Sequence, residues 1–312
     1  MLLSEEGNRL CTEIAMKPIA KITVAIPTLD RPDGLLRCLE ALLIQGTALP
    51  EEVLIIDQGN YQIGEKAINE VRSKSVIPIV HCSQAKLGLS AARNLASSQA
   101  SHDIVAFTDD DCVPDPNWLA SIERMLTSCP ELDGVTGRIL PLESEAAELF
   151  PISTRTSRKA ATFQGHKFPW NVGSGGNFAI KRAKLQRVGG YDERLGTGSA
   201  GKSAEDIDIF YRLLLAGTVI RYQPEVVIYH ERQDAERLIR SFWNYSHGFG
   251  AFTAKHLRKG DWYAAYLWSI WFFWLVWRTG KAVVLRQNVY AREGLLSLKG
   301  FSYGLAYGFK LR

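Results

Sequence analysis

The feature that most limits what this chain can fold into is an alternation of short apolar runs and amphipathic stretches over residues 21–108. Four runs are apolar, rich in β-branched residues and short enough to be buried strands: 21–27, 52–57, 78–82 and 103–108. Three stretches between them carry apolar residues at helical spacing: 33–45, 65–73 and 90–99. This order of elements predicts a doubly wound α/β fold with a mostly parallel sheet.

The second half of the chain is less regular. Its apolar spacing predicts helices at 181–188 and 203–216, and short strands at 218–222 and 226–229. Glycine is frequent between residues 189 and 202, so we expect a flexible loop there.

Polar residues stand where three of the predicted strands end: Pro27-Thr28, Asp57 and Asp109-Asp110-Asp111. In open α/β sheets ligands bind beyond the carboxyl ends of the strands, so this placement is a first indication of function. Adjacent carboxylates repel one another unless a cation compensates them. Asp109 and Asp111 are two residues apart, and extended backbone directs them to one side, where they suit Mg²⁺ or Mn²⁺ bound with a phosphate. The alternative is a solvated turn with incidental acids.

Glu205 and Asp206 begin the helix predicted after the glycine-rich loop. Carboxylates in that position either complement the helix dipole or, beside a site, act as a general base. Asp208 faces away from Asp206 at helical spacing, and we interpret it as structural.

Four other polar residues are candidate binding residues, and each has two possible roles. Arg93-Asn94, near a helix start, either holds a phosphate or forms a surface ion pair. Asp57 either binds a base or ribose or caps a turn, and His230, at a strand end, is either a metal ligand or a structural residue.

The charge and the tryptophans are concentrated at the C-terminal end. Residues 231–312 carry 13 basic and 5 acidic side chains, a net charge of +8, whereas the preceding 230 residues have a net charge of −4. The same segment holds six of the eight Trp, and 262–277 is an uncharged run of 16 residues. A spanning helix needs roughly 20 apolar residues, and Trp and Tyr favour the headgroup level. We therefore expect a helix lying on an anionic membrane; the alternatives are a helix packed on protein and, least favoured, a span extended over 282–285.

Seven segments taken together resemble the inverting family 2 glycosyltransferases of the GT-A fold. They occur in the family's order over about residues 20–235: VAIPTLDRPDGLLRCLEAL (24–42), VLIIDQGN (53–60), KLGLSAARN (86–94), AFTDDDCVPDPNWL (106–119), GSGGNFAIKR (173–182), AEDIDIFYRLLLAG (204–217) and PEVVIYHE (224–231).

The resemblance implies a role for each candidate. The residues implied to bind the nucleotide sugar are Pro27, Thr28, Asp57, Arg93, Asn94, Asp109, Asp110 and Asn177. Those implied to hold Mn²⁺ or Mg²⁺ are Asp109, Asp111 and His230. Asp206 is the implied catalytic base, with Glu205 as the second candidate.

The chemistry implied is direct displacement of a nucleoside diphosphate, usually uridine diphosphate, by an acceptor hydroxyl that a carboxylate deprotonates. One base without a second nucleophilic carboxylate implies inversion at the anomeric carbon. The 189–202 loop would close over the donor. The family's processive members carry a Gln-x-x-Arg-Trp motif and several transmembrane helices; neither occurs here, so we expect transfer of a single sugar. Gln58-Gly59-Asn60 departs from the family's usual turn after Asp57, which leaves the base open.

We expect an N-terminal extension at 1–20, a GT-A domain at 21–235 and a basic aromatic helical tail at 236–312. Within the GT-A domain, 21–112 would be the nucleotide-binding half and 113–235 the acceptor half. The expected partners are a nucleotide-sugar donor, a lipid-linked or surface-glycan acceptor and an anionic membrane, with homo-oligomerisation left open. The net charge of +4 and the lack of a recognisable motif argue against a nucleic-acid partner. The expected location is cytoplasmic, peripheral at the inner face of the plasma membrane. A nucleotidyltransferase and a non-catalytic sugar-nucleotide-binding module are the alternative functions.

Overall fold

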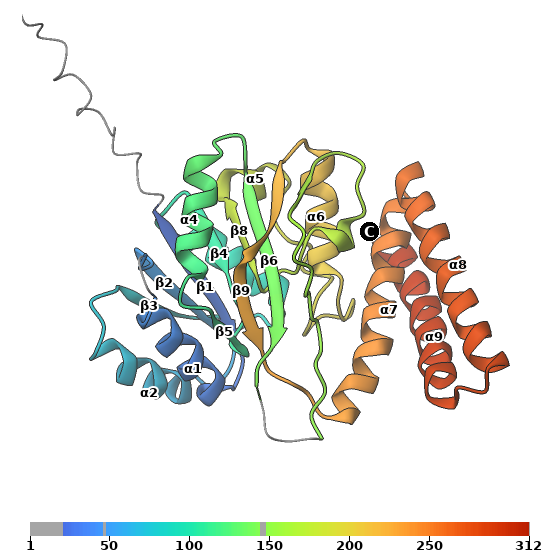
Figure 1. Cartoon of the computed structure of the whole chain (residues 1–312), viewed down its shortest axis with the longest axis horizontal. Helices are drawn as coiled ribbons and strands as arrows, with labels where there is room; N and C mark the ends of the chain where they lie inside the picture. The colour runs from blue at the N-terminus through green and yellow to red at the C-terminus, as the bar shows by residue number, and fades with distance from the viewer. Residues whose placement is uncertain (1–20, 46–47, 144–147, 312) are drawn as a thin grey trace, which may run out of the picture.

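A computed structural model describes residues 21–45, 48–143 and 148–311, and the expected N-terminal extension lies outside them. The described strands form one nine-stranded sheet in the order β3-β2-β1-β4-β8-β6-β9-β5, with β7 paired to β9 (Figure 1). The strands are β1 Ile22–Thr28, β2 Glu52–Asp57, β3 Ile79–Ser83, β4 Ile104–Phe107, β5 Cys112–Pro114, β6 Gly134–Pro141, β7 Ala161–Phe163, β8 Phe178–Lys181 and β9 Ile220–His230.

The N-terminal half has the predicted alternation of strands and helices. Strands β1 to β4 are parallel to their neighbours among themselves, and helices α1, α2 and α3 connect them. The helices are α1 Pro32–Leu43, α2 Tyr61–Arg72 and α3 Leu89–Gln99. Helix α2 begins four residues before the predicted start because the side chain of Asn60 accepts the backbone N–H of Gln62 and caps it.

The second half makes the sheet mixed, so the expected parallel arrangement describes only part of it. Strand β8 is antiparallel to β4 and β6, and β9 is parallel to β6 but antiparallel to β5 and β7. The two short strands predicted at 218–222 and 226–229 are wrong as separate elements, because β9 runs through both. Its pairing with β6 shifts register between Gly137 and Arg138, which absorbs the irregularity that the sequence shows around Pro224.

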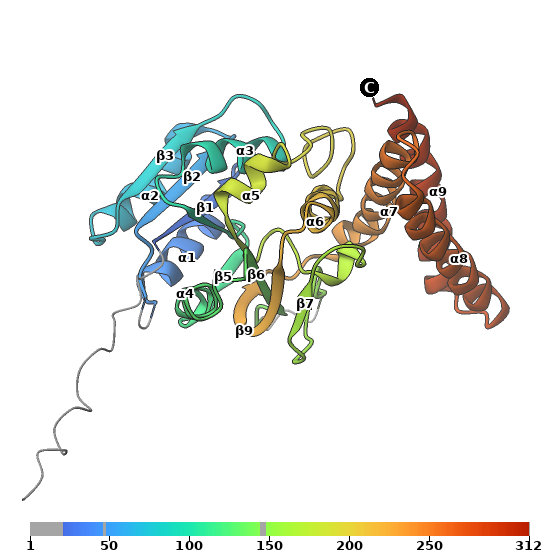
Figure 2. The same cartoon turned by 90° about the horizontal axis from the view of Figure 1, so that it is seen from above.

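Helices cover both faces of the sheet, as a doubly wound fold requires (Figure 2). Helices α1 and α4 bury their apolar residues in a core on one face, whereas α3, α5 and α6 do so on the other. The second-half helices are α4 Trp118–Ser128, α5 Arg182–Arg187 and α6 Glu205–Leu215, with a short 3₁₀ turn, η1, at Pro169–Asn171. The carboxyl ends of β1 and β4 remain uncovered between these layers and open toward α6.

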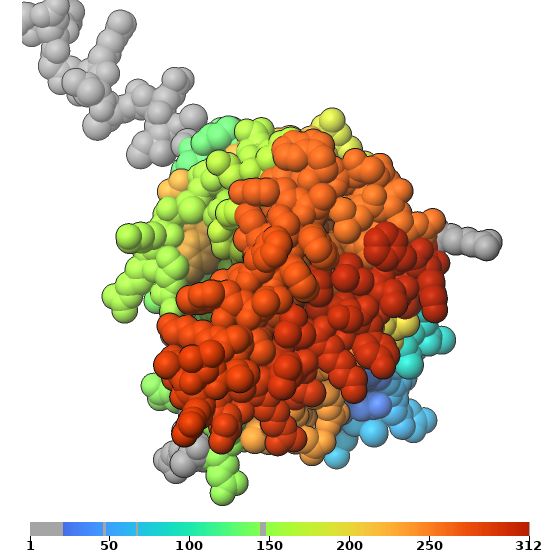
Figure 3. Space-filling view, turned by 90° about the vertical axis from the view of Figure 1, so that its right-hand side faces the viewer, coloured from blue at the N-terminus to red at the C-terminus, as the bar shows by residue number. Residues whose placement is uncertain are grey.

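The C-terminal residues form three long helices: α7 Ala235–Leu257, α8 Trp262–Val284 and α9 Asn288–Lys310. Together they cover one side of the molecule next to α6 (Figures 1 and 3). Helix α9 lies very close to α7 because Gly304 faces the backbone of His247, where any Cβ would overlap the carbonyl oxygen. Among the described residues, every helix is too short or too polar to span a bilayer.

An ion-pair cluster joins these helices to the sheet domain. Asp208 on α6 is completely buried and accepts from Arg212 Nε at 2.8 Å, Lys255 Nζ at 2.7 Å and His256 Nε2 at 2.9 Å. Lys255 and His256 belong to α7, so Asp208 is structural, as predicted from its spacing. Tyr211 on α6 also donates to Asp261, the residue that caps α8, at 2.6 Å.

Candidate active site

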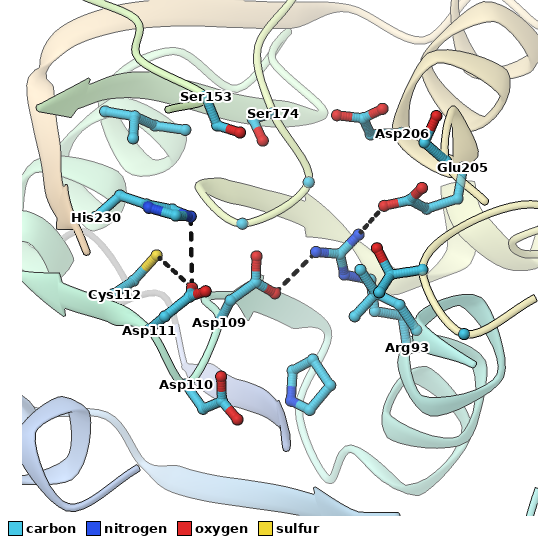
Figure 4. A pocket seen from close by; sticks show the side chains of 18 of the residues that line it. Arg93, Asp109, Asp110, Asp111, Cys112, Ser153, Ser174, Glu205, Asp206 and His230 are labelled. Atoms are coloured by element: carbon cyan, nitrogen blue, oxygen red, sulfur yellow. Dashed lines mark hydrogen bonds and ion pairs between the residues drawn. The ribbon is translucent and has the colours of Figure 1, made fainter. Parts of the chain in front are cut away.

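A cavity of about 680 Å³ lies beyond the carboxyl ends of β1 and β4, and Figure 4 shows its interior. Its walls come from the loops after these strands, from the 153–155 and 173–176 segments, from the start of α6 and from α7. The sequence-predicted residues that line it are Pro27, Thr28, Arg93, Asp109, Asp110, Asp111, Glu205, Asp206 and His230. The fold therefore gathers residues from most of the length of the chain at one cavity.

The three adjacent carboxylates point to different partners. Asp109 accepts from Arg93 at 2.9 Å, and Asp110 accepts from Thr28 Oγ1 at 2.8 Å. Asp111 accepts from Arg31 at 2.7 Å and lies 3.5 Å from Nε2 of His230. This division of partners lets three acids stand side by side without full mutual repulsion.

The surroundings of Asp110 and Asp111 move their pKa values in opposite directions. Burial raises the pKa of Asp110 to about 6, although Arg31, 3.1 Å away, opposes the shift. Burial would also raise the pKa of Asp111, but the charges of His230 and Arg31 outweigh it and hold that pKa below its usual range. Asp111 therefore stays ionised at neutral pH.

Asp111, Cys112 and His230 place their ligand atoms within 4.8 Å of one another. A carboxylate oxygen and an imidazole nitrogen form a donor set that suits Mn²⁺. Burial raises the pKa of the Cys112 thiol well above its ordinary value, so Asp111 and His230 are the members of this group that could ligate a cation at neutral pH. The carboxylate of Asp109 points to Arg93 rather than to this group.

Glu205 and Asp206 differ in their surroundings although they are adjacent. Glu205 is buried and accepts from the buried Arg93 at 3.3 Å. Burial raises the pKa of Glu205 to about 7, and the neighbouring charge of Asp206 adds to the shift. Asp206 is partly exposed in the cavity, and one of its oxygens accepts the N–H of Ile207 at 2.8 Å. Asp206 is thus the better placed of the two to receive a proton from a ligand.

Three residues expected to bind the donor are not brought to the wall of this cavity. Asp57 is buried and bonded to the N–H of Gly59 and to Nε2 of His81. The amide of Asn94 bonds to Tyr191 on both its oxygen and its nitrogen. Asn177 accepts from the indole of Trp118 at 2.8 Å and donates to two backbone carbonyls. These hydrogen bonds account for the three side chains as parts of the protein interior. Contact between them and the donor stays a prediction.

The loop expected to be flexible is tied to its neighbours by hydrogen bonds. The hydroxyl of Ser90 donates to the carbonyl of Leu195 at 2.7 Å, and the N–H of Leu89 donates to the carbonyl of Thr197 at 2.9 Å. Within the loop, Ser199 bonds to the carbonyls of Gly196 and Arg194. The glycines of 189–202 thus serve left-handed turns rather than a free segment, since Gly196 and Gly198 have φ near +98° and +83°.

The sequence reasoning missed several residues of the cavity. Arg31, in the turn after β1, joins Asp110, Asp111 and Glu231. The wall that faces these acids was not predicted at all; its members include Ser153, Thr154, Arg155, Trp170, Arg237 and Tyr245. A basic residue directly after the first strand was the available signal for Arg31, and the facing wall has no local signal.

Family models match most of the described chain. The model described as "Glycosyl transferase family 2" matches residues 23–189, and "Glycosyltransferase like family 2" matches residues 145–271. The first covers more than half of the chain and includes Thr28, Arg93 and the three acids.

Curated relatives are also similar over about two thirds of this chain or more. A pre-mycofactocin glycosyltransferase of Mycobacterium tuberculosis is 28% identical over 217 residues, which are 68% of this chain and 43% of that protein. The chain thus spans less than half the length of this relative. A glucosyl-dolichyl phosphate glucuronosyltransferase of Haloferax volcanii is 24% identical over 72% of this chain and 74% of its own.

Two solved structures share the fold. A mannosyltransferase from Pyrobaculum calidifontis, in complex with GDP-Man and Mn²⁺, has a TM-score of 0.61 at 16% identity, over 94% of this chain and 88% of its own. TarS of S. aureus, in complex with UDP, has a TM-score of 0.54 at 16% identity, over 73% of this chain and 65% of its own.

Proposed function

Because the chain belongs to glycosyl transferase family 2, we propose that it transfers one sugar from a nucleoside-diphosphate sugar, a UDP-sugar, to an acceptor hydroxyl with inversion. The alternatives of a nucleotidyltransferase and a non-catalytic module give way to the family match, which makes the chain a glycosyltransferase. The observation that carries the finer proposal is the cavity itself. It places Asp111 and His230 on one wall and the partly exposed Asp206 on another, with room between them for a nucleotide sugar.

The residues of this chain divide the work of the proposed reaction. Asp206 accepts the proton of the acceptor hydroxyl as that oxygen bonds to the anomeric carbon. Arg93 stays charged, because its carboxylate neighbours raise its pKa against the effect of burial, and it fixes Asp109 and Glu205 around the cavity. No other carboxylate takes the role of a nucleophile in this scheme, so each transfer inverts the anomeric centre.

A divalent cation fits this cavity on the evidence of its donor atoms. Asp111 and His230 would hold it, and Asp109 is close enough along the chain to join them after releasing Arg93. When bound, such a cation stabilises the negative charge that develops on the leaving diphosphate. The Mn²⁺ in the mannosyltransferase with this fold supports the proposal, and Mg²⁺ offers the same chemistry.

Calorimetric titration with UDP, GDP, dTDP and CDP, first with Mn²⁺ and then with EDTA, tests the donor and the cation together. We expect one nucleotide to bind with Mn²⁺ and to lose most of its affinity in EDTA. The structures with GDP-Man and UDP support both GDP and UDP as candidates, so the panel decides between them. Nucleotide affinity that is the same in Mn²⁺ and in EDTA would contradict a role for the cation. Inversion is tested separately, by NMR of the product, which shows whether the bond at the anomeric carbon changes from axial in the donor to equatorial in the product.

We further propose that the C-terminal helices seat the enzyme on an anionic membrane, peripheral at the inner face of the plasma membrane, where a lipid-linked acceptor resides. The support is an apolar surface on the half of the α8–α9 hairpin that lies next to its turn, here called the hairpin tip. Its exposed residues are Phe273, Trp274, Trp277, Val284, Leu285, Val289 and Tyr290. Phe273 and Trp277 are 66% and 61% exposed, unlike residues of a helix buried on protein. Lys281 lies over the ring of Trp277, so positive charge accompanies the aromatic surface.

Flotation with phosphatidylglycerol and phosphatidylcholine vesicles tests the hairpin tip. Full-length protein is expected to float with the anionic vesicles, and the F273S/W277S variant to stay in the soluble fraction. Val76, 93% exposed on the far α2–β3 connection, gives a matched control as V76S. Equal recovery of all three proteins would refute membrane seating and leave the glycosyltransferase proposal intact.

A further inference from the structure

Arg155 is an arginine of the cavity wall without a carboxylate partner. Its guanidinium donates to the backbone carbonyl of Trp170, and no Asp or Glu of the described residues lies within 4.0 Å of it. Arg31 and Arg93, in the same cavity, are each paired with two or more carboxylates. A charge taken partly out of water needs a counter-charge. The protein supplies carboxylates to Arg31 and Arg93, and Asp234 lies 3.8 Å from the exposed Arg237, whereas the half-buried Arg155 has no such partner among the described residues.

The surroundings of Arg155 hold its side chain at the cavity rather than in solvent. Its backbone pairs with Ile139 of β6 through two hydrogen bonds of 2.8 and 2.9 Å. Burial lowers the pKa of the guanidinium, and the charge of Asp206 is the largest effect that opposes it. Arg155 therefore lies within electrostatic reach of the proposed base, and its positive charge is held in place at a cost that a bound anion would offset.

Helix α7 completes this part of the wall. Tyr245 bonds to Ser153 through their hydroxyls at 2.8 Å, and Arg237, one turn into α7, also lines the cavity. Trp170 packs edge-on against Phe249 of α7. Figure 4 shows Ser153 and Ser174 across the cavity from Asp109 and Asp111, so the 153–155 segment faces the side proposed for the diphosphate.

We propose that Arg155, assisted by Arg237, forms a subsite for an anionic group of the acceptor, a phosphate or a carboxylate. The inference rests on the proposed function, because it takes Asp206 as the base and the Asp111–His230 side as the donor position. An anion bound at Arg155 places the acceptor beside Asp206, and Trp170 offers an aromatic surface to the group that carries it. The acceptor class is thus an anionic glycan or a lipid phosphate rather than a neutral sugar.

Phenyl phosphate is the probe, with phenyl β-glucoside as its neutral counterpart, and ligand-observed NMR measures both affinities on the full chain. The titrations are made with and without Mn²⁺ and the nucleoside diphosphate that binds in calorimetry. Phenyl phosphate is expected to bind in both conditions, and R155Q to weaken it about 10- to 100-fold, the range for hydrogen bonds to a charged group. R155K should keep part of the affinity, and R237Q should weaken it less than R155Q. Arg221, bonded to Thr162 outside the cavity, gives the matched control R221Q.

The outcomes separate this proposal from the proposed function. Nucleotide binding without phenyl phosphate binding overturns the anion subsite alone, whereas loss of nucleotide binding overturns the donor site. Phenyl phosphate that is displaced by nucleotide and Mn²⁺ occupies the donor position and refutes the assignment. Affinities of UDP-glucuronate and UDP-glucose for the wild type and R155Q give the last distinction. If R155Q loses affinity for UDP-glucuronate but not for UDP-glucose, Arg155 binds the carboxylate of the donor sugar, which refutes the proposal. If R155Q and the wild type bind each nucleotide sugar equally well, the result supports an anion on the acceptor. If R155Q does not fold by circular dichroism, R155K and R237Q carry the same comparison.

Discussion

Replacement of Asp208 by Asn tests whether the C-terminal helices are anchored by charge. The wild-type carboxylate accepts from Arg212, Lys255 and His256 at 2.7–2.9 Å and is completely shielded from water. Breaking a buried pair by removing one partner costs about 3–5 kcal/mol. Lys255 retains Asp192 at 2.7 Å, and Arg212 retains the carbonyl of Val188 at 2.7 Å, so we expect the lower end, about 3 kcal/mol.

Urea unfolding monitored by two probes measures this loss. Tryptophan fluorescence reports mainly on the C-terminal helices, because six of the eight Trp lie at or beyond residue 243, and far-ultraviolet circular dichroism reports on the whole chain. We expect the fluorescence transition of D208N to move to lower urea by more than the circular dichroism transition.

The pH dependence of the difference in unfolding free energy between wild type and D208N can refute this role of Asp208. Burial would raise the pKa of Asp208, but the charges of Arg212 and Lys255 and the hydrogen bond from His256 outweigh it and hold that pKa well below its usual range. A depressed pKa means that the stabilisation is present above the unfolded pKa of about 3.9 and is lost only as pH falls toward the lower folded pKa. The difference in unfolding free energy between wild type and D208N should therefore be constant from pH 8 to pH 5. A difference below about 1 kcal/mol at pH 7, or one that vanishes by pH 6, would show that Asp208 does not anchor α7.

Four further predictions follow from single residues. Asp111→Asn should weaken nucleotide binding in Mn²⁺ at least tenfold and leave the affinity in EDTA unchanged, which calorimetry checks. Glu205→Gln should gain stability over the wild type as pH rises from 5 to 8. The raised pKa of about 7 makes the contribution of Glu205 complete below pH 4.3 and lost through pH 7, by up to about 3 kcal/mol in urea unfolding. Gly304→Val should lower the thermal midpoint because its Cβ overlaps the His247 carbonyl. Gly280→Ala, which has open space around it, should raise stability by about 1 kcal/mol.

The predictable parts of the fold are those whose signals are local. Strands β1, β2 and β4 are short, buried on both faces and accompanied by helices with clear apolar spacing, so each of these elements can be identified within its own window. Strand β9 was not predicted as one element because Pro224 suggests a break. In the structure residues 224–226 bulge out of the pairing with β6, between Gln223 opposite Gly137 and Val227 opposite Arg138, and the strand stays continuous. The three-residue strands β5 and β7 exist only through pairing with β9 and have no pattern of their own.

The candidate site shows the same division between local and distant signals. The acids at 109–111 and 205–206 stand at a strand end and a helix start, and the sequence finds them without knowledge of the fold. Arg31 is different, because its partners lie 79 to 200 positions away, and no window contains both. Asn177 lies in a glycine-rich segment that looks functional, yet the indole of Trp118, 59 positions earlier, takes up its oxygen. Polar residues near a site can therefore be recognised from sequence, but their partners decide which of them face the ligand.

Helix α7 connects the two proposals that concern the acceptor. Its N-terminal half brings Arg237 and Tyr245 to the cavity that Arg155 also lines, and its C-terminal end carries Lys255 and His256 to Asp208. Along its length α9 packs so closely that Gly304 admits no side chain, and α9 in turn leads back to the hairpin tip. The surface proposed to bind anionic lipid and the subsite proposed to bind an anionic acceptor are thus both connected to α7, the first through its packing with α9. This arrangement favours an acceptor whose charged group lies at the membrane surface, since the enzyme then reaches it without moving α7 away from the base Asp206.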